Sequence, residues 1–341
     1  EAVAGAGIRV SVIQSARHDA RIERDGIVYR FLPLAGHEGM RRVASELRRI
    51  RADAVHLHGL DYARHAHALA KLMPSLPILL QDHANRPPPW WRRALWRRWY
   101  GAASAITFTS MALARPFVEA GLFDRSTRLF AVPESSCAFT PGDRATARLE
   151  TGLHGRPCVA WVGHFDANKD PLTLLDGVAA AARELPGLQL WCAYGKAPLL
   201  DAVRGGTAND QVLASRVHLV GPGPRERIQQ WRRAGDVFVA ASHSESCGYA
   251  AMEAMACGAT PALTDIPAFR ALTADGRVGR LPTPGDATPL SNALVQPRTH
   301  APPREPVPFS FVAPLPLPLL GSSITASPRP PLPLSLSLSQ Q

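Results

Sequence analysis

Residues 236–264, DVFVAASHSESCGYAAMEAMACGATPALT, decide the fold of this chain. The run from Asp236 to Ala241 is almost wholly apolar, which is typical of a strand buried on both faces of a parallel sheet. A polar bend follows, and the stretch YAAMEAMAC then predicts a helix that ends at Gly258, a residue type favoured just beyond a helix. A second apolar run occupies 259–263. Strand, loop, helix and strand in this order form the repeating unit of a doubly wound α/β sheet.

Two carboxylates in this stretch are candidate ligand-binding groups. Glu245 lies in the loop past the carboxyl end of the strand, where open α/β sheets bind ligands. Glu253 stands alone on an apolar helix, and such a carboxylate is costly to bury unless something hydrogen-bonds it. The amides of residues 248–250, which open this helix, can face an anion. On spacing alone an alternative stays open, in which Glu253 extends into water and Glu245 has no role beyond the loop.

The segment S-H-S-E-S-C-G-Y-A-A-M-E-A-M-A-C-G at 242–258 resembles the signature of the family 4 retaining glycosyltransferases. That family usually carries S-x-x-E-x-F-G, four residues and E-A-M-A-x-G; here Cys247 stands where an aromatic residue is usual. The resemblance extends over about 8–295. It implies the α/β GT-B fold, in which the parallel sheets of two Rossmann-like domains face an interdomain cleft.

The chain is expected to divide into four segments. Alternating strands and helices predict a Rossmann-like domain over 1–132, which the resemblance makes the acceptor-side domain. Residues 133–157 are polar and carry several prolines and glycines, as expected for an interdomain connection. Residues 158–295 alternate again, as the nucleotide-sugar-binding domain. The tail, 296–341, holds 12 of the chain's 32 prolines and is expected to be disordered or polyproline-like.

The resemblance also implies that the first domain is incomplete. EAVAGAGIRVSVIQ at 1–14 is similar to the end of the family's first helix followed by its second strand. The first strand and its glycine-rich loop would then be missing, and so would the usual C-terminal helices. We therefore expect the middle of the first sheet to be one strand short, with unpaired backbone edges.

GHFDANKDPLTLL, which begins at Gly163, is similar to the family's G-R-x-x-x-x-K-G, whose Arg and Lys grip the donor diphosphate. Lys169 falls on the Lys position, and a compact ammonium neutralises a diphosphate oxygen well. His164 falls on the Arg position, where an imidazole gives one donor in place of a bidentate fork. Without the motif, Lys169 would be read as a solvated residue ahead of a helix at Pro171.

The resemblance assigns the remaining donor contacts. Glu245 is expected to orient the sugar hydroxyls and Glu253 to hold the ribose, while the amides near Gly248 and Tyr249 add hydrogen bonds. Lys169 and Glu245 are thereby the predicted catalytic groups of the donor side, and no metal or other cofactor is expected.

The first domain contains several histidines that are candidate functional residues. His83 follows an apolar strand and resembles the acceptor-side histidine of many family members, the third predicted catalytic residue; the alternative is a structural histidine bonded to a neighbouring carbonyl. His56 and His58 alternate on a strand and share a face, with His65 and His67 nearby in sequence. No known ligand spacing accompanies them, so a metal site is not expected.

PPPWWRRALWRRWY at 87–100 could contact a membrane or nucleic acid, because basic and aromatic residues alternate in it. Packing of the aromatics on the sheet, with the arginines in water, is the favoured interpretation. The net charge of +10 favours anionic partners. No nucleic-acid motif is present, so that partner is not expected. A weak peripheral membrane contact stays open because many acceptors of the family are linked to lipid.

Five scattered cysteines without a C-x-x-C indicate a reducing compartment, and no apolar run approaches the roughly 18 residues that a membrane span needs. We therefore expect a cytoplasmic protein, with a peripheral position at the inner face of the membrane as the alternative. The predicted activity is retaining transfer of a sugar from a nucleoside diphosphate to a hydroxyl group. A GT-B remnant that binds nucleotide or a partner without transfer, and a GT-B epimerase of nucleotide sugars, are the alternatives.

Overall fold

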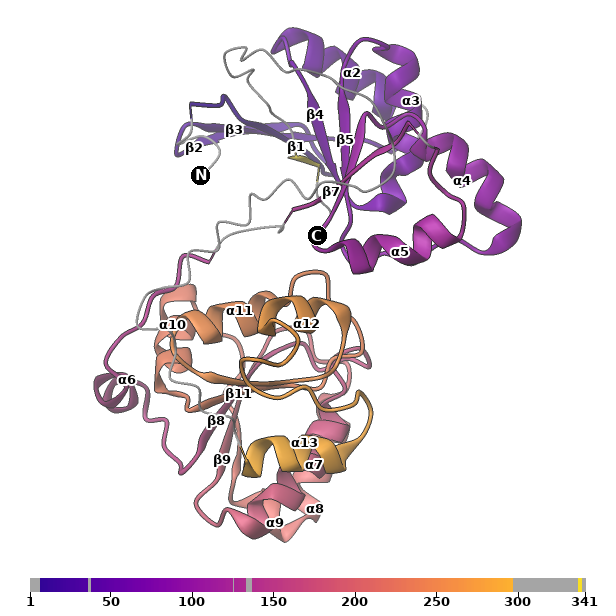
Figure 1. The fold of residues 1–341 in the computed structure, drawn as a ribbon. Helices are drawn as coiled ribbons and strands as arrows, with labels where there is room; N and C mark the ends of the chain where they lie inside the picture. The colour runs from indigo at the N-terminus through magenta and orange to yellow at the C-terminus, as the bar shows by residue number, and fades with distance from the viewer. Residues whose placement is uncertain (1–6, 36–37, 125, 133–136, 297–336, 339–341) are drawn as a thin grey trace. The chain divides into compact units, whose positions relative to one another are not determined.

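The computed structural model describes residues 7–35, 38–124, 126–132, 137–296 and 337–338 (Figure 1). They fall into two compact units that part between Pro133 and Glu134, with the last two described residues joined to the first unit. Apart from Gln296 and Ser337–Leu338, the expected tail lies outside the described residues. No helix in these ranges has the length and apolar composition that crossing a bilayer requires.

Unit 1 is built on one sheet with the strand order β2-β3-β1-β13-β4-β5-β6-β7, parallel except for the antiparallel pair β2–β3. Its helices bring apolar side chains such as Val43, Ala66 and Phe117 onto a core with Ile13 and Leu57. The strands are β1 (Ser11–Ser15), β2 (Ala20–Arg24), β3 (Ile27–Leu32), β4 (Val55–His58), β5 (Ile78–Gln81), β6 (Ala105–Phe108), β7 (Arg128–Ala131) and β13 (Ser337–Leu338). The helices are α2 (Gly39–Arg49), η1 (Leu60–Tyr62), α3 (Ala63–Leu72), η2 (Trp90–Arg92), α4 (Arg93–Tyr100) and α5 (Met111–Glu119).

Two features of this sheet differ from expectation. The strand β2 is exposed along its whole length and turns into β3 through Gly26, whose φ is +73°. Between β1 and β4, where a strand was expected to be missing, β13 pairs in parallel with both neighbours through Ser337 and Leu338. The expectation of a wholly unstructured tail is therefore wrong at these two residues, because open backbone edges on β1 and β4 accept an extended segment.

Unit 2 is a five-stranded parallel sheet in the order β10-β9-β8-β11-β12. Its strands are β8 (Cys158–Gly163), β9 (Gln189–Tyr194), β10 (Val217–Leu219), β11 (Val237–Ala240) and β12 (Thr260–Leu263). The helices are α6 (Arg144–Thr151), α7 (Pro171–Glu184), α8 (Leu200–Asn209), α9 (Gln211–Ala214), α10 (Arg225–Ala234), α11 (Tyr249–Ala256), α12 (Pro267–Thr273) and α13 (Ala287–Val295). Beside β12, Ala262 and Arg280 form an isolated parallel β-bridge.

Helices cover both faces of this sheet, which explains why its strands are apolar throughout. Alternate residues of β8 point to opposite faces: Val159 and Trp161 join the core under α7 and α13, whereas Ala160 joins the core under α11 and α12. Figure 1 shows α10, α11 and α12 on one side of the sheet and α7, α8, α9 and α13 on the other.

Helix α6 lies within the stretch expected to be an interdomain connection. Asp143 caps its first turn by accepting a hydrogen bond from the Thr146 amide at 2.7 Å, and Gly152 ends it with a φ of +74°. Arg148 donates to Asp236 at 2.7 Å, which fixes the helix beside β11. Residues 144–151 are thus an integral helix of unit 2, and the polar composition that suggested a linker belongs to its caps and its exposed face.

Candidate active site

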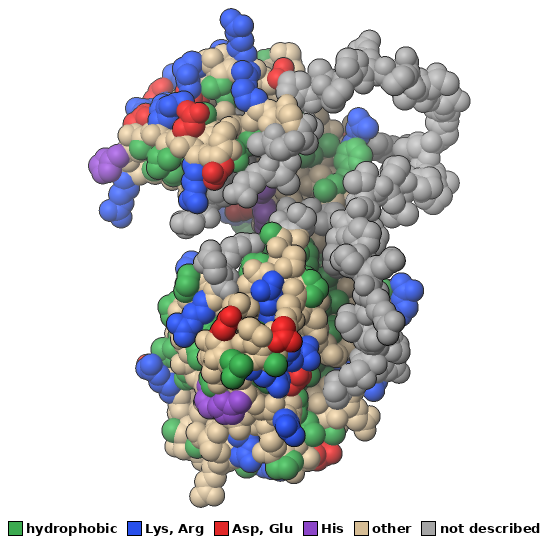
Figure 2. Space-filling view, turned by 90° about the vertical axis from the view of Figure 1, so that its left-hand side faces the viewer, with side chains coloured by type: hydrophobic (Ala, Val, Ile, Leu, Met, Phe, Trp, Pro, Cys, Tyr) green, Lys and Arg blue, Asp and Glu red, His purple; other side chains and the backbone are tan. Residues whose placement is uncertain are grey.

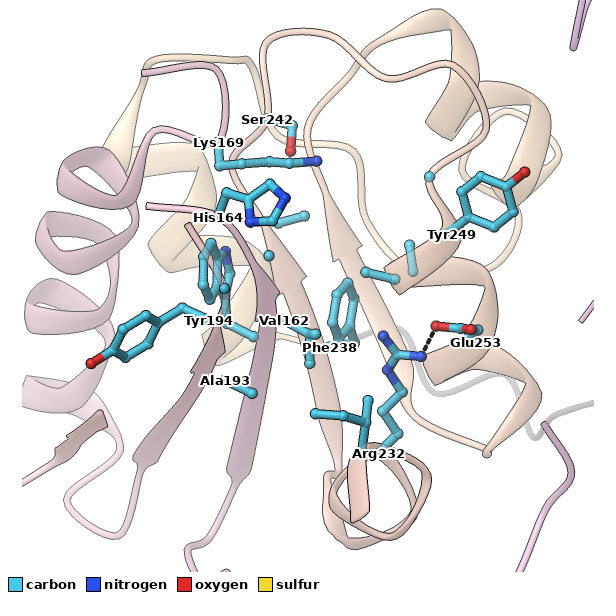
Figure 3. Close-up of a pocket in the computed structure, with 18 of the residues that line it drawn as sticks. Val162, His164, Lys169, Ala193, Tyr194, Arg232, Phe238, Ser242, Tyr249 and Glu253 are labelled. Atoms are coloured by element: carbon cyan, nitrogen blue, oxygen red, sulfur yellow. Dashed lines mark hydrogen bonds and ion pairs between the residues drawn. The ribbon is translucent and has the colours of Figure 1, made fainter. Parts of the chain in front are cut away.

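A pocket of about 400 Å³ lies in unit 2, at the edge of the sheet where the parallel strands end. The residues that follow β8, β9 and β11 meet there, because the carboxyl ends of parallel strands share one edge. Six of the seven residues predicted to form the site line this pocket: His164, Lys169, Glu245, Gly248, Tyr249 and Glu253. Figure 3 shows Lys169 and His164 at one end and Glu253 toward the other, with Phe238 between them.

The Lys169 ammonium lies 2.5 Å from the Glu245 carboxylate. The two side chains come from different loops, and only 22% and 16% of their surfaces are exposed. Lys169 is therefore no solvated residue of a helix terminus, and Glu245 does more than occupy a loop. Two opposite charges held together in a half-buried pocket are suited to bind a ligand that carries both phosphate and hydroxyl groups.

Hydrogen bonds between the two loops fix this pair in place. The His243 amide donates to the Asn168 carbonyl at 2.8 Å, and the Asn168 side-chain amide donates to the Ser244 carbonyl at 2.9 Å. His243 Nε2 is 3.0 Å from Asp170, whose carboxylate also caps α7. The residues on either side of Lys169 thus bind the residues just before Glu245, a support that the sequence motifs did not reveal.

Glu253 forms an ion pair with Arg232, a residue of α10 that the sequence analysis did not identify. Arg232 is 3% exposed and Glu253 16% exposed at the side chain, and both line the pocket. The guanidinium also lies over the ring of Phe139, 5.2 Å from its centroid. The alternative in which Glu253 extends into water is therefore wrong, because a cation from a neighbouring helix compensates its burial.

The N-terminus of α11 opens onto the same pocket. Gly248 has a φ of +71°, and a Cβ on this residue would lie 2.6 Å from the Phe269 ring. Both constraints require glycine here. Because Gly248 offers no side chain as a cap, the first amides of the helix remain directed at the pocket beside Tyr249 and Ala250. Such a terminus attracts anions.

His164 presents one nitrogen to the pocket. Its Nδ1 accepts a hydrogen bond from the Lys196 amide at 3.1 Å, and the imidazole packs against Gly195. With Nδ1 acting as an acceptor, a neutral ring carries its proton on Nε2 and can donate one hydrogen bond there. Figure 3 shows the ring beside Lys169.

The seventh predicted residue, His83, belongs to unit 1. Its Nε2 lies 3.1 Å from Nδ1 of His58, at the carboxyl ends of β4 and β5. Asp82 is buried and accepts hydrogen bonds from the amides of Ala84 and Asn85 at 3.2 and 3.0 Å. The turn that carries His83 is therefore rigidly held, as a positioned functional histidine would require.

A third histidine, His56, lies beside His58 with ring centroids 4.3 Å apart and the rings tilted by 33°, as their shared face predicted. Burial, followed by the nearby charge of His58, lowers the pKa of His56 to about 4. No group of three or more His, Cys, Asp or Glu residues in the described ranges is arranged to hold a metal ion.

Sequence comparison places unit 2 among known proteins. Residues 156–297 match the family described as "Glycosyl transferases group 1". This region belongs to that family. The chain is 37% identical over 147 residues to a D-inositol 3-phosphate glycosyltransferase of Mycobacteroides abscessus and 33% identical over 189 residues to one of Nocardia farcinica. The matches cover 42% and 53% of this chain and only 32% and 42% of those relatives.

Structure comparison extends the likeness to both units. Sucrose-phosphate synthase from Thermosynechococcus elongatus superposes with a TM-score of 0.70 at 20% identity, covering 86% of this chain and 80% of that one. Anabaena HepE, in complex with UDP and glucose, gives 0.61 at 16% identity, with coverages of 84% and 89%. The glycosyl transferases group 1 region therefore sits within a GT-B fold, as the sequence predicted.

Proposed function

We propose that this protein is a retaining glycosyltransferase, which moves a sugar from a nucleoside diphosphate donor to a hydroxyl group of a saccharide, lipid or small molecule. The observation that carries the proposal is the Lys169–Glu245 pair at the strand ends, beside the amides of α11. The names of the relatives and the UDP and glucose bound to HepE point to the same class of substrate. No metal ion or other cofactor is part of the proposal.

The reaction needs charge stabilised on the departing group. The bond between the anomeric carbon and the diphosphate oxygen breaks, and its electron pair leaves with the diphosphate. The acceptor oxygen bonds to the same face of that carbon, and its proton passes to the departing phosphate. Lys169 would neutralise the developing charge, with one hydrogen bond from His164 and others from the amides of Gly248 and Tyr249.

The two carboxylates would bind the hydroxyl groups of the donor. When Lys169 turns to the diphosphate, Glu245 is released to accept hydrogen bonds from the sugar. A carboxylate has about four acceptor sites, so Glu253 can keep Arg232 and still accept from the ribose. His83, paired with His58, is proposed to face the acceptor.

We also propose a cytoplasmic location. All five cysteines are free thiols, and four of them are buried. Such a set of unpaired thiols is typical of proteins from a reducing compartment.

A second candidate is a protein that binds the nucleotide sugar without transferring it. The observation in its favour is that both pocket carboxylates already have cationic partners, so the site is electrostatically complete by itself. A ligand could then be held with no turnover.

Incubation of the full chain with a panel of sugar nucleotides and acceptors, followed by measurement of released nucleoside diphosphate, tests the proposal. Lys169→Ala should lower the release by roughly a hundredfold, because one stabilising group of the departing charge is removed. Lys196→Ala is the matched control, since Lys196 is an exposed lysine whose backbone alone supports His164. Donor-induced thermal stabilisation without any release would establish the second candidate instead.

A further inference from the structure

The proposed function leaves one prominent surface of unit 1 unexplained. Trp90, Trp91 and Leu95 are exposed by 79%, 62% and 49%. We call these three side chains the tryptophan patch. Single exposed apolar residues are ordinary, but two adjacent tryptophans and a leucine one helical turn after Trp91 place three exposed apolar side chains in one short segment, and such groups usually meet a partner.

Other aromatic residues of the same segment are packed against unit 1, so the exposure is limited to the tryptophan patch. Trp96, Trp99 and Tyr100 recur at helical spacing and pack on the core of unit 1, so α4 is already fixed by one face. The favoured interpretation of the sequence, in which the aromatics pack and only arginines meet water, is therefore right for these three residues and wrong for Trp90 and Trp91. These two tryptophan side chains are therefore not needed to attach α4 to unit 1.

The chain segment that carries the tryptophan patch has only basic charged residues. Residues 86–100 contain five arginines and no acidic residue. Among the described residues Arg92 makes a cation–π contact with Trp91 at 4.6 Å and no ion pair, and Arg98 is likewise exposed without an ion pair. Lys71 on α3 and Arg98 both lie close enough to depress the pKa of His67, after the larger effect of burial. Of these five arginines, Arg97 alone forms an ion pair with a described residue, Asp124 at 2.6 Å.

From this combination we infer that the tryptophan patch docks unit 1 on the surface of an anionic lipid bilayer. Tryptophan rings prefer the boundary between head groups and acyl chains, and a leucine beside them adds apolar area to bury. Unpaired arginines on the same outer face would meet acidic lipid head groups, and their long stems allow the charge to stay in water. A short helix held on its inner side by the core is suited to lie in the plane of such a boundary.

Nucleic acid and a second copy of the chain are weaker occupants of this surface. Stacking on bases would use the two tryptophans but would give Leu95 nothing to pack on. A copy of the same surface would bring unpaired arginines against arginines, which is unfavourable for a symmetric interface. The bilayer satisfies the rings, the leucine and the positive charge together.

Sedimentation of the full chain with lipid vesicles tests the inference. We expect binding to vesicles that contain phosphatidylglycerol, little binding to pure phosphatidylcholine, and weaker binding as salt rises. Trp90→Ser/Trp91→Ser should lower the affinity at least about tenfold, because two interfacial anchors are lost. Leu149→Ser on α6 of unit 2 removes an apolar side chain that is 87% exposed and should change nothing.

A second variant separates the two contributions. Arg92→Gln/Arg98→Gln should abolish the preference for anionic lipid while a weak, salt-insensitive binding remains. Equal binding of wild type and the double tryptophan variant would overturn the inference, as would binding of single-stranded nucleic acid or self-association in place of vesicle binding. Release of nucleoside diphosphate from the donor during transfer to a soluble acceptor does not depend on the patch, so failure here leaves the proposed transfer untouched.

Discussion

The carboxyl-end edges of the two sheets are built from different chemistry. In unit 2, that edge holds opposite charges in pairs, Lys169 with Glu245 and Arg232 with Glu253. In unit 1, it holds three histidines, with His58 between His56 and His83. Arginine and lysine keep their charge at any physiological pH, whereas histidine changes charge near neutrality. Figure 2 shows basic and acidic side chains scattered over the visible face of both units, so the two units do not differ in this way on that face.

The comparison shows that sheets of similar topology can place either kind of side chain at this edge: one that stays charged, or one whose charge depends on pH. Charges in unit 2 suit a ligand that is always anionic, such as a diphosphate. The histidines of unit 1 can form hydrogen bonds to an uncharged hydroxyl when their rings are neutral. Each edge can be perturbed separately.

The largest effect on stability is expected from the buried charges of unit 2. Arg232→Leu removes the buried cation that pairs with Glu253 and should lower the free energy of unfolding by about 3 kcal/mol. Urea denaturation of the full chain measures this. Arg97→Leu is the control, because its partner Asp124 and Arg97 itself are about half exposed, and less than about 1 kcal/mol should be lost.

The double variant Arg232→Leu/Glu253→Leu completes this test. It should recover most of the lost stability, because no uncompensated charge remains. If the double variant is no more stable than Arg232→Leu, the packing of the arginine side chain, and not its charge, is what unit 2 needs.

A smaller effect is expected from the backbone that directs α11 at the pocket. Gly248→Ala should cost about 2 kcal/mol, because φ is positive and the new methyl group meets Phe269. Gly258→Ala provides the comparison: its φ is +89°, but nothing lies within 4 Å of the added Cβ, so only the backbone cost of about 1 kcal/mol applies. Thermal denaturation distinguishes them, and equal losses would show that the Phe269 contact is unimportant.

Much of this architecture could be predicted from local patterns. The apolar runs at 236–241 and 259–263 located β11 and β12 closely, and the loop after the first run marked the edge where the pocket lies. The motif residues Lys169 and Glu245 lie 76 positions apart and form an ion pair, because each follows the end of a parallel strand and those ends share an edge.

What could not be predicted depends on tertiary packing. The helix α10 contains four arginines, and nothing in its sequence tells which of them turns inward to Glu253. Strand β2 has one apolar residue beyond its alanine, so no alternating pattern marks it. Trp90 and Trp91 lie in η2, a short 3-10 turn that runs directly into α4, and helical periodicity does not reveal which of their side chains it leaves exposed.

The most gradual expected effect, spread over a range of pH, concerns the histidines of unit 1. The pKa of His56 falls from an ordinary 6.5 to about 4 on folding, chiefly through burial. Between these two values the unfolded chain binds more protons than the folded one, so His56 makes the free energy of unfolding fall as the pH drops through this window. The slope is about 1 kcal/mol per pH unit at most. Denaturation of wild type and His56→Gln across the window isolates this contribution, since the two proteins share every other titrating group. Parallel stability curves would show that His56 is accessible enough to be protonated in the folded chain, and the contrast between the two edges would then be one of residue type without a difference in charge.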